Sequence, residues 1–281
     1  MHLRAFGILA TFLLVSSACF ASFELRSLNI TITLNSDGTA HAVEQARLFI
    51  TGNNSIHLYE QSKVFNDLSS WTSRTGISDI RTHVSRLYVE LEDLQVRPAS
   101  VERCNNLAQT CYATLTIDYN IYPITENSSG ILQAENYKPR TTKYSLRSEA
   151  FTFERSKTDD LILPKGTAIK ILVPQKAQQI TFAKVPDNLD KDSPFFVFAP
   201  DTGNTYYLGQ AREFMWSSQS PFKFALSYEI ELSLEEEIVG FFSQLQAAIF
   251  TRLLSAEGLA YILAACTILL SIVWLHSLEP K

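Results

Sequence analysis

The alternation of apolar and polar residues near the N-terminus predicts that the folded part of the chain begins with a β-hairpin. Residues Leu28–Leu34 alternate strictly, with leucine and isoleucine separated by asparagine and threonine. A period of two places alternate side chains on opposite faces of a strand. Asn35–Gly38 has the composition of a turn, and Gly38 tolerates positive φ there. The strand pattern resumes over Thr39–Ile50, so we expect two paired antiparallel strands.

Short runs rich in β-branched and aromatic residues recur as far as residue 232, and they predict a mainly β protein. Many prolines between Pro123 and Pro221 fall at the ends of these runs, as they do in sandwiches of short strands. We therefore expect an antiparallel β-sandwich with one short helix between Phe65 and Arg74. The further strands expected are Ile56–Gln61, Leu87–Leu91, Leu94–Val96, Ala113–Tyr122, Thr142–Phe153, Ile169–Val173, Ile180–Ala183, Phe195–Phe198, Thr205–Leu208 and Phe222–Leu232.

A polar segment in the middle of this region, Thr125–Thr141, is a candidate domain boundary. It contains Gly130 and Pro139, and it would separate two lobes, residues 22–126 and 138–232. The alternative is that it forms a long loop within one domain, because single all-β domains reach about 200–250 residues. We favour the single domain.

The first 21 residues have the layout of a secretory signal peptide, which predicts export. Arg4 precedes an apolar stretch from Ala5 to Val15, and small residues follow up to Ala21. The apolar stretch is short for a bilayer core about 30 Å thick. Two alternatives stay open: cleavage before Cys19 followed by lipidation, and an uncleaved signal anchor.

A second apolar segment, residues 257–276, predicts one transmembrane helix. No charged residue occurs between Gly258 and Leu275, and a helix of that length covers about 27 Å. A signal peptide followed by one such helix gives a type I topology. The mainly β region, 22–232, is then an ectodomain at the cell surface or in the secretory-pathway lumen, and residues 277–281 form a cytoplasmic tail.

Residues 233–256 predict an amphipathic juxtamembrane helix between the ectodomain and the span. Ser233 and Glu236 form a capping-box pattern. Apolar residues from Ile238 to Leu253 then recur at helical spacing. This helix would lie on the lipid bilayer or against the ectodomain. A hairpin of two membrane helices is the alternative, which Arg252 disfavours.

The cysteines and glycosylation sequons support the exported location. Of the four cysteines, Cys104 and Cys111 are the two in the ectodomain, and two cysteines in an oxidising compartment are expected to form a disulfide. The bridge would close a hairpin loop between two strands. Sequons occur at Asn29, Asn53 and Asn127, so the chain is a candidate glycoprotein.

Composition and charge narrow the classes of partner. The chain has 281 residues, 46% of them hydrophobic, and a formal net charge of −5 with a pI near 5.6. A nucleic-acid partner is not expected, because binding to nucleic acid requires a concentrated basic surface. The mean hydropathy of +0.01 averages a polar ectodomain with two apolar segments.

The sequence motifs do not predict catalysis. The ectodomain histidines His41, His57 and His83 occur outside H-E-x-x-H, and no G-x-S-x-G is present. We interpret these histidines as structural. The acidic run Asp187–Asp192 departs from calcium-loop spacing and predicts a solvated loop, and Asp159-Asp160 predicts a turn. We therefore assign no catalytic, cofactor-binding or metal-ligating residue.

Two features are candidates for partner binding. Lys138, Arg140, Lys143 and Arg147 place four cations close together in the sequence, which could contact an anionic partner, although a charged strand edge explains them as well. Trp71 is a candidate binding anchor, with burial in the core as the alternative.

We expect a non-enzymatic membrane protein that recognises or assembles with a protein or glycan near the bilayer. An exported hydrolase or carbohydrate-active enzyme is one alternative, and a structural envelope component is another.

Overall fold

The computed structural model describes residues 22–124, 130–138, 140–217 and 219–233, together with Glu235, Ile238, Phe242, Gln246 and Thr267. The chain divides into two compact units. In the described part, the larger unit contains residues 22–137 and 142–230, and the smaller contains residues 138–141 and those from 231 onward.

Several predicted segments lie outside the described residues: the signal peptide (1–21), the tail (277–281), and the transmembrane helix (257–276) apart from Thr267. The structure describes no helix that is both long and apolar enough to cross a bilayer. In the predicted amphipathic helix, the described residues Glu235, Ile238, Phe242 and Gln246 are all helical.

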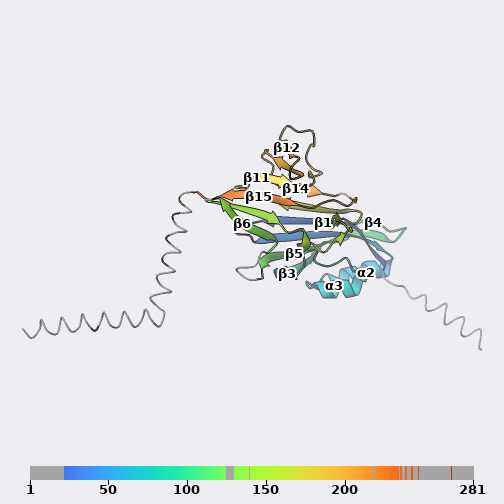
Figure 1. Cartoon of the computed structure of the whole chain (residues 1–281). Coiled ribbons are helices and arrows are strands. Elements are labelled where there is room, and N and C mark those ends of the chain that lie inside the picture. Colours follow the sequence, from blue (N-terminus) through green and yellow to red (C-terminus); the bar gives the residue numbers. More distant parts are fainter. Residues whose placement is uncertain are drawn as a thin grey trace, which may run out of the picture. The chain divides into compact units, whose positions relative to one another are not determined.

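The first sheet of the larger unit grows from the predicted hairpin (Figure 1). Its first two strands pair in antiparallel register from Ser22↔Thr51 to Leu34↔Ala40. In the connecting turn Gly38 has a φ of 87°, and the Thr39 amide donates to the Asp37 carboxylate. The strands are β1 (Ser22–Leu34), β2 (Ala40–Thr51), β3 (Val89–Pro98), β4 (Glu102–Asn105), β5 (Thr110–Pro123), β10 (Thr167–Leu172) and β14 (Glu213–Trp216), in the order β14-β10-β1-β2-β5-β3 with β4 paired to β5.

One pair in this sheet is parallel, which corrects the expected antiparallel architecture. β1 and β10 run side by side from Leu28↔Thr167 to Thr33↔Leu172. Gly166 precedes β10 with a φ of 79°, and a Cβ atom there would lie 2.6 Å from the Arg26 carbonyl oxygen. The sequence could not reveal this pairing, because side-chain alternation is the same in both orientations and no tight turn links strands so far apart. The pairing joins strands from before and after the segment 125–141 in one sheet.

The second sheet contains six strands in the order β12-β13-β11-β15-β7-β6. In Figure 1 its edge strand β12 is uppermost. The strands are β6 (Leu132–Lys138), β7 (Thr141–Leu146), β11 (Gln178–Phe182), β12 (Phe196–Ala199), β13 (Asn204–Tyr207) and β15 (Leu226–Glu231). A separate pair is formed by β8 (Glu154–Arg155) and β9 (Leu161–Ile162), and a short 3₁₀ helix, η1, covers Ser148–Ala150.

Aromatic side chains join the two sheets in one hydrophobic core. The Phe182 ring on β11 lies 4.8 Å from Phe214 and 5.9 Å from Trp216, both on β14. Tyr207 on β13 also contacts Phe214, with ring centroids 5.7 Å apart. Burial of these rings explains why β14 pairs at the edge of the first sheet while its side chains face the second.

Two helices lie between β2 and β3 in the chain. The predicted strand Ile56–Gln61 is wrong, because these residues belong to helix α2 (Asn53–Ser62). Its buried residues Ser55, Tyr59 and Ser62 follow helical spacing, which the alternation of Ile56 and Leu58 concealed. The helix expected between Phe65 and Arg74 is confirmed as α3 (Leu68–Thr75), which Asp67 caps by accepting from the Ser70 amide at 2.8 Å.

Candidate functional site

A carboxylate lies fully buried in the first sheet. Glu44 is on β2, between the core-facing residues Ala42 and Ala46, and its exposure is 0%. Removing a carboxylate from water is costly unless hydrogen bonds replace the lost hydration. The surroundings of Glu44 therefore decide whether the site is stable.

Three donors satisfy this carboxylate. The Tyr119 hydroxyl donates to Oε1 at 2.5 Å, the His83 backbone N–H donates to Oε1 at 2.7 Å, and His83 Nδ1 lies 2.6 Å from Oε2. Tyr119 reaches Glu44 from the neighbouring strand β5, where it pairs with Ala42. Burial, followed by the charge of Glu44, raises the pKa of Tyr119, so its hydroxyl stays protonated and continues to donate. We call Glu44, His83 and Tyr119 the buried polar cluster.

Backbone and ring contacts fix the orientation of His83. The Thr152 amide donates to the His83 carbonyl at 3.0 Å, and the imidazole stacks on Phe153 with centroids 5.0 Å apart. Because Nδ1 faces the Glu44 carboxylate, it carries a hydrogen. Nε2 is the ring nitrogen that remains, and among the described residues it has no hydrogen-bond partner.

A cavity of about 280 Å³ lies beside this ring, and we call it the His83 cavity. Its walls include His83, Thr152 and Phe153, with Ser27, Leu28 and Thr167 from β1 and β10. The Thr152 hydroxyl oxygen is buried and has no hydrogen-bond partner within the described part of the chain. Thr152 and His83 are therefore not joined by the hydroxyl-to-imidazole hydrogen bond of an activated nucleophile.

Four charged side chains also line the His83 cavity. Asp79, Arg81, Glu154 and Lys165 are all exposed. Two of them are anionic and two cationic, so their formal charges cancel. The entrance therefore favours neither an anion nor a cation by net charge.

The second unusual region is an exposed apolar edge of the second sheet. We call residues 195–208, which contain β12 and β13, the edge hairpin. Four large apolar side chains are exposed there: Phe195 (52%), Val197 (48%), Phe198 (63%) and Leu208 (64%). Leu208 lies across from Phe195, whose carbonyl accepts its N–H at 2.9 Å. Alternation along β12 places Val197 on the same face as Phe195.

Trp71 is not available to a partner, which corrects its selection as a binding anchor. Its exposure is 0%, its ring packs 5.3 Å from that of Tyr59, and its indole N–H donates to the Phe65 carbonyl. Trp71 is buried on the same face of α3 as Thr75, so the alternative, a residue of the core, is the one that the structure shows.

The four cations selected from the sequence are divided between the two units. Lys138 and Arg140 belong to the smaller unit, and Lys143 and Arg147 to the larger. Arg140 Nη2 donates to the Leu232 carbonyl at 2.8 Å, and the Arg147 guanidinium lies 5.4 Å from the centroid of the Tyr88 ring. Their use as a common binding surface stays a prediction.

The predicted disulfide is confirmed. Cys104 on β4 and Cys111 on β5 are bridged, with their Cα atoms 4.1 Å apart. The side chains of Asn29 and Asn53 are exposed, whereas Asn127 lies outside the described residues. Glycosylation of these sequons stays a prediction.

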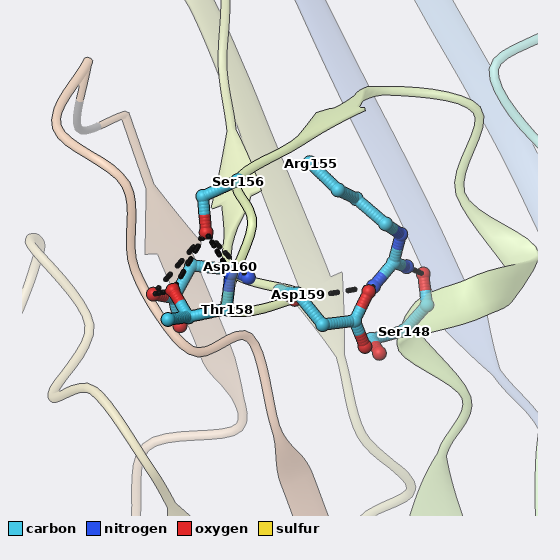
Figure 2. Close-up of polar contacts among 6 residues, drawn as sticks. All are labelled: Ser148, Arg155, Ser156, Thr158, Asp159 and Asp160. Atoms are coloured by element: carbon cyan, nitrogen blue, oxygen red, sulfur yellow. Dashed lines mark hydrogen bonds and ion pairs between the residues drawn. The ribbon is translucent and has the colours of Figure 1, made fainter.

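The carboxylates selected as loop or turn residues make local contacts. Figure 2 shows Arg155 paired with Asp159 and the Thr158 hydroxyl donating to Asp160, at 2.8 and 2.6 Å, around the turn between β8 and β9. Arg155 also donates to the Ser148 carbonyl. In the acidic run, Asp187 accepts from the Ser217 amide at 2.8 Å. In the part of the chain that the structure describes, no group of three or more histidine, cysteine or acidic side chains could hold a metal ion.

The sequence contains a signal for the buried polar cluster that does not correspond to a catalytic motif. Along β2 the core-facing positions from Ala40 to Ile50 are apolar except for Glu44. A charged residue within such an alternation indicates a buried charge that needs partners. The partners Tyr119 and His83 are distant in sequence, so spacing alone could not identify them.

Comparisons with known proteins add little. No protein-family model matches the chain, and no curated protein matches it. Among solved structures, the chain is similar to the NMR structure of the folded domain of the LppM protein of Mycobacterium tuberculosis. The identity is 9%, the match covers 77% of this chain and 95% of that one, and the TM-score is 0.26. A similarity at this level carries no functional inference.

Proposed function

We propose that this protein is a non-enzymatic, type I single-pass membrane protein whose β-sandwich ectodomain assembles with another protein near the membrane. The apolar segments at residues 1–21 and 257–276 support this topology. The observation that supports assembly is the edge hairpin, which exposes Phe195, Val197 and Leu208 on one face.

Clustering distinguishes the edge hairpin from ordinary surface apolar residues. Single exposed apolar side chains are common, whereas a contiguous patch at a sheet edge is typical of an interaction surface. The neighbouring Phe196 turns inward, with its ring 5.3 Å from that of Tyr207. The hairpin is therefore anchored in the core through Phe196 and exposes Phe195, Val197 and Leu208 on the opposite face. Phe198 lies two residues from Phe196, so it shares the face of Phe196, and it is exposed as well.

The backbone of β12 offers a short edge to a partner. The carbonyls of Phe195 and Ala199 accept hydrogen bonds from Leu208 and Gly203, at the two ends of the hairpin. Residues between these two hydrogen-bonded positions alternate in direction, so the backbone of Phe198 points away from β13, whereas the Phe196 N–H already donates to the Ser193 carbonyl at 3.2 Å. An extended segment of a partner could align there.

Charge indicates the chemistry of that partner. Asp190 and Asp192 precede the strand and Asp201 follows it, with Lys191 as the one base in these two flanks, and all four are exposed. Acidic flanks around an apolar strand complement an apolar segment bordered by lysine or arginine. Complex formation should therefore weaken as the salt concentration rises.

Co-purification of the full chain from its membrane tests this proposal. The double variant Phe195→Ser/Val197→Ser removes two side chains of the patch, while Val64→Ser removes an isolated apolar side chain that is 80% exposed. We expect a discrete protein to co-purify with the wild type and with Val64→Ser and to be at least about tenfold depleted with the double variant. An identical set of co-purifying proteins in all three samples would refute docking at the edge hairpin.

A further inference from the structure

Another cavity, of about 730 Å³, lies beside helix α3, and we call it the α3 groove. Residues of α3 line one side of it, and Leu94 on β3 and the loop between these two elements line the rest. Leu68 on α3 and Leu94 are both half-buried, so each presents part of an apolar side chain to the groove. A pocket of this size with an apolar wall is typical of a ligand site.

A β-bulge determines the face of β3 on which Leu94 lies. The register of β3 against β5 shifts between Glu92 and Gln95, and Asp93 within the shift has a φ of 54°. Alternation from the start of the strand would place Leu94 on the opposite face, and the extra residue returns it to the face of the buried Val96. The bulge therefore supplies one of the two apolar walls of the groove.

Three of the hydroxyl groups in the groove are already bonded within the chain. Thr72 and Ser73 donate to backbone carbonyls of α3, each at 3.0 Å, and the Ser69 hydroxyl donates to the Asp67 carboxylate at 2.7 Å. Because each hydroxyl has a single hydrogen, these groups have no further donor for a ligand. The wall between the two leucines therefore suits an alkyl chain, which needs no hydrogen bonds, better than the backbone of a peptide.

Two arginines supply positive charge to the groove. Arg81 and Arg86 line it and are exposed, and neither has an ion-pair partner within the part of the chain that the structure describes. Asp67 is the one carboxylate among the described residues of the wall. The hydroxyl of Ser69, followed by the amide of Ser70, lowers the pKa of Asp67 to about 2, so Asp67 is ionised at neutral pH. One negative charge on an occupant therefore neutralises the wall.

We propose that the α3 groove binds a fatty acid, a monocarboxylate with a linear alkyl chain. Arginine binds a carboxylate through two parallel hydrogen bonds, so Arg81 and Arg86 hold the carboxylate while the chain lies along Leu68 and Leu94. The groove accommodates about 24 water-sized groups at ~30 Å³ each, and a methylene is close to that size, so a chain of about 12–16 carbons fits. This site is separate from the edge hairpin and does not depend on the function proposed for that hairpin.

Photocrosslinking on the full chain in lipid nanodiscs tests the proposal. The probe is dodecanoate with a diazirine in its chain, compared with the alcohol and the amine that carry the same chain, and mass spectrometry locates the labelled residues. We expect the carboxylate to label residues 66–73 and Leu94 at least about tenfold more than the other two probes do. Equal labelling by all three probes would overturn the proposal.

The position of the label separates the α3 groove from the His83 cavity. Arg81 lines both, so a carboxylate held by Arg81 alone could direct its chain into either. Ser27 and Pro164 line only the His83 cavity. Labelling of these two residues in place of α3 would contradict the proposed site.

Charge variants test the contact with the carboxylate. Arg81→Gln/Arg86→Gln removes both arginines of the groove, and Arg97→Gln/Arg103→Gln is the matched control, because it removes two exposed arginines that lie outside it. We expect labelling of residues 66–73 to fall at least about tenfold in the first variant and to be unchanged in the control. Exposed positions such as these tolerate substitution, so undiminished labelling in the first variant, or an equal fall in both, would refute the assigned contact.

Chain length tests the contact with the apolar wall. Unlabelled dodecanoate, decanoate and octanoate compete with the probe, and each step removes two methylenes from the buried chain. We expect the competing concentration to rise about threefold to tenfold at each step. Equal competition by the three acids would show that the alkyl chain does not lie in the groove, and the proposal would then be wrong.

Discussion

In the first sheet a carboxylate lies inside the hydrophobic core, whereas in the second sheet four large apolar side chains lie outside it. Glu44 has an exposure of 0%, and Phe198 in the edge hairpin has an exposure of 63%. Both reverse the usual distribution of residues, in which charges face water and large apolar groups are buried. They differ in where their partners are: the buried polar cluster finds its hydrogen bonds within the chain, and the edge hairpin does not cover its apolar face.

Substitutions in the two regions should have different effects on the stability of the folded state. Removing one member of a satisfied buried network leaves the others without partners, so the folded state loses free energy. Removing an exposed apolar side chain leaves no buried group unsatisfied, so the folded state is little affected. Stability measurements can therefore test whether each region has been assigned correctly.

The largest effect is expected for Glu44→Ala. This variant leaves the Tyr119 hydroxyl and both donors of His83 without their common acceptor. We expect the free energy of unfolding to fall by about 3–5 kcal/mol, as for other broken buried networks. Urea denaturation of the full chain, followed by the fluorescence of the buried Trp71 and Trp216, provides the measurement.

Glu44→Gln is the matched control for this prediction. Glutamine has nearly the same shape and keeps one oxygen that can accept from Tyr119 and from the His83 amide, so we expect a smaller loss than for alanine. Equal losses for the two variants would show that the volume of the side chain, and not its hydrogen bonds, stabilises this part of the core.

Tyr119→Phe gives the next largest effect and adds a dependence on pH. The variant removes one hydrogen bond to a carboxylate, so we expect a loss of about 1.5–3 kcal/mol at neutral pH. Burial and the charge of Glu44 raise the pKa of Tyr119 above its usual value near 10. Above pH 10 the unfolded chain therefore releases this proton while the folded chain retains it. The wild type should lose stability as pH rises, by up to about 1.4 kcal/mol per pH unit from this group, and Tyr119→Phe should lack that contribution.

Tyr228→Phe tests the effect of a raised tyrosine pKa at a hydroxyl that makes no hydrogen bond. Burial is the first cause that raises the pKa of Tyr228 as well, but its buried hydroxyl has no hydrogen-bond partner in the part of the chain that the structure describes. We expect this variant to reduce the alkaline loss of stability in the same way, with no destabilisation at neutral pH. A neutral-pH loss equal to that of Tyr119→Phe would contradict the assigned partners.

The sequence predicted those parts of the molecule that local patterns determine. The hairpin of β1 and β2 follows from strict alternation and a glycine-containing turn, and the Cys104–Cys111 bridge follows from two cysteines close together between strands. Helix α2 was missed because packing of Tyr59 overrides the local alternation. The parallel pairing of β10 with β1 depends on contacts between residues far apart in the chain.

The two unusual regions were predictable to different degrees. Both strands of the edge hairpin were expected from composition, but their position at the edge of a sheet depends on strand order, which the sequence does not encode locally. In the buried polar cluster, Glu44 was visible as a break in an apolar alternation. Its link to His83 required the loop before β3 to fold over β2, so the His83 cavity could not be predicted.

The smallest effect is expected for Phe198→Ser, and it tests the edge hairpin most directly. Phe198 is exposed, so its replacement should change the free energy of unfolding by no more than about 0.5 kcal/mol. Phe196 is two residues away on the same strand and packs on Tyr207. Phe196→Ser should therefore cost about 1–2 kcal/mol through lost apolar contact. Equal costs in urea denaturation would mean that the chain itself covers Phe198, and a partner would then have no free apolar face to bind. A large difference would mean that the folded domain does not depend on the Phe198 side chain, which is then free to contact a partner.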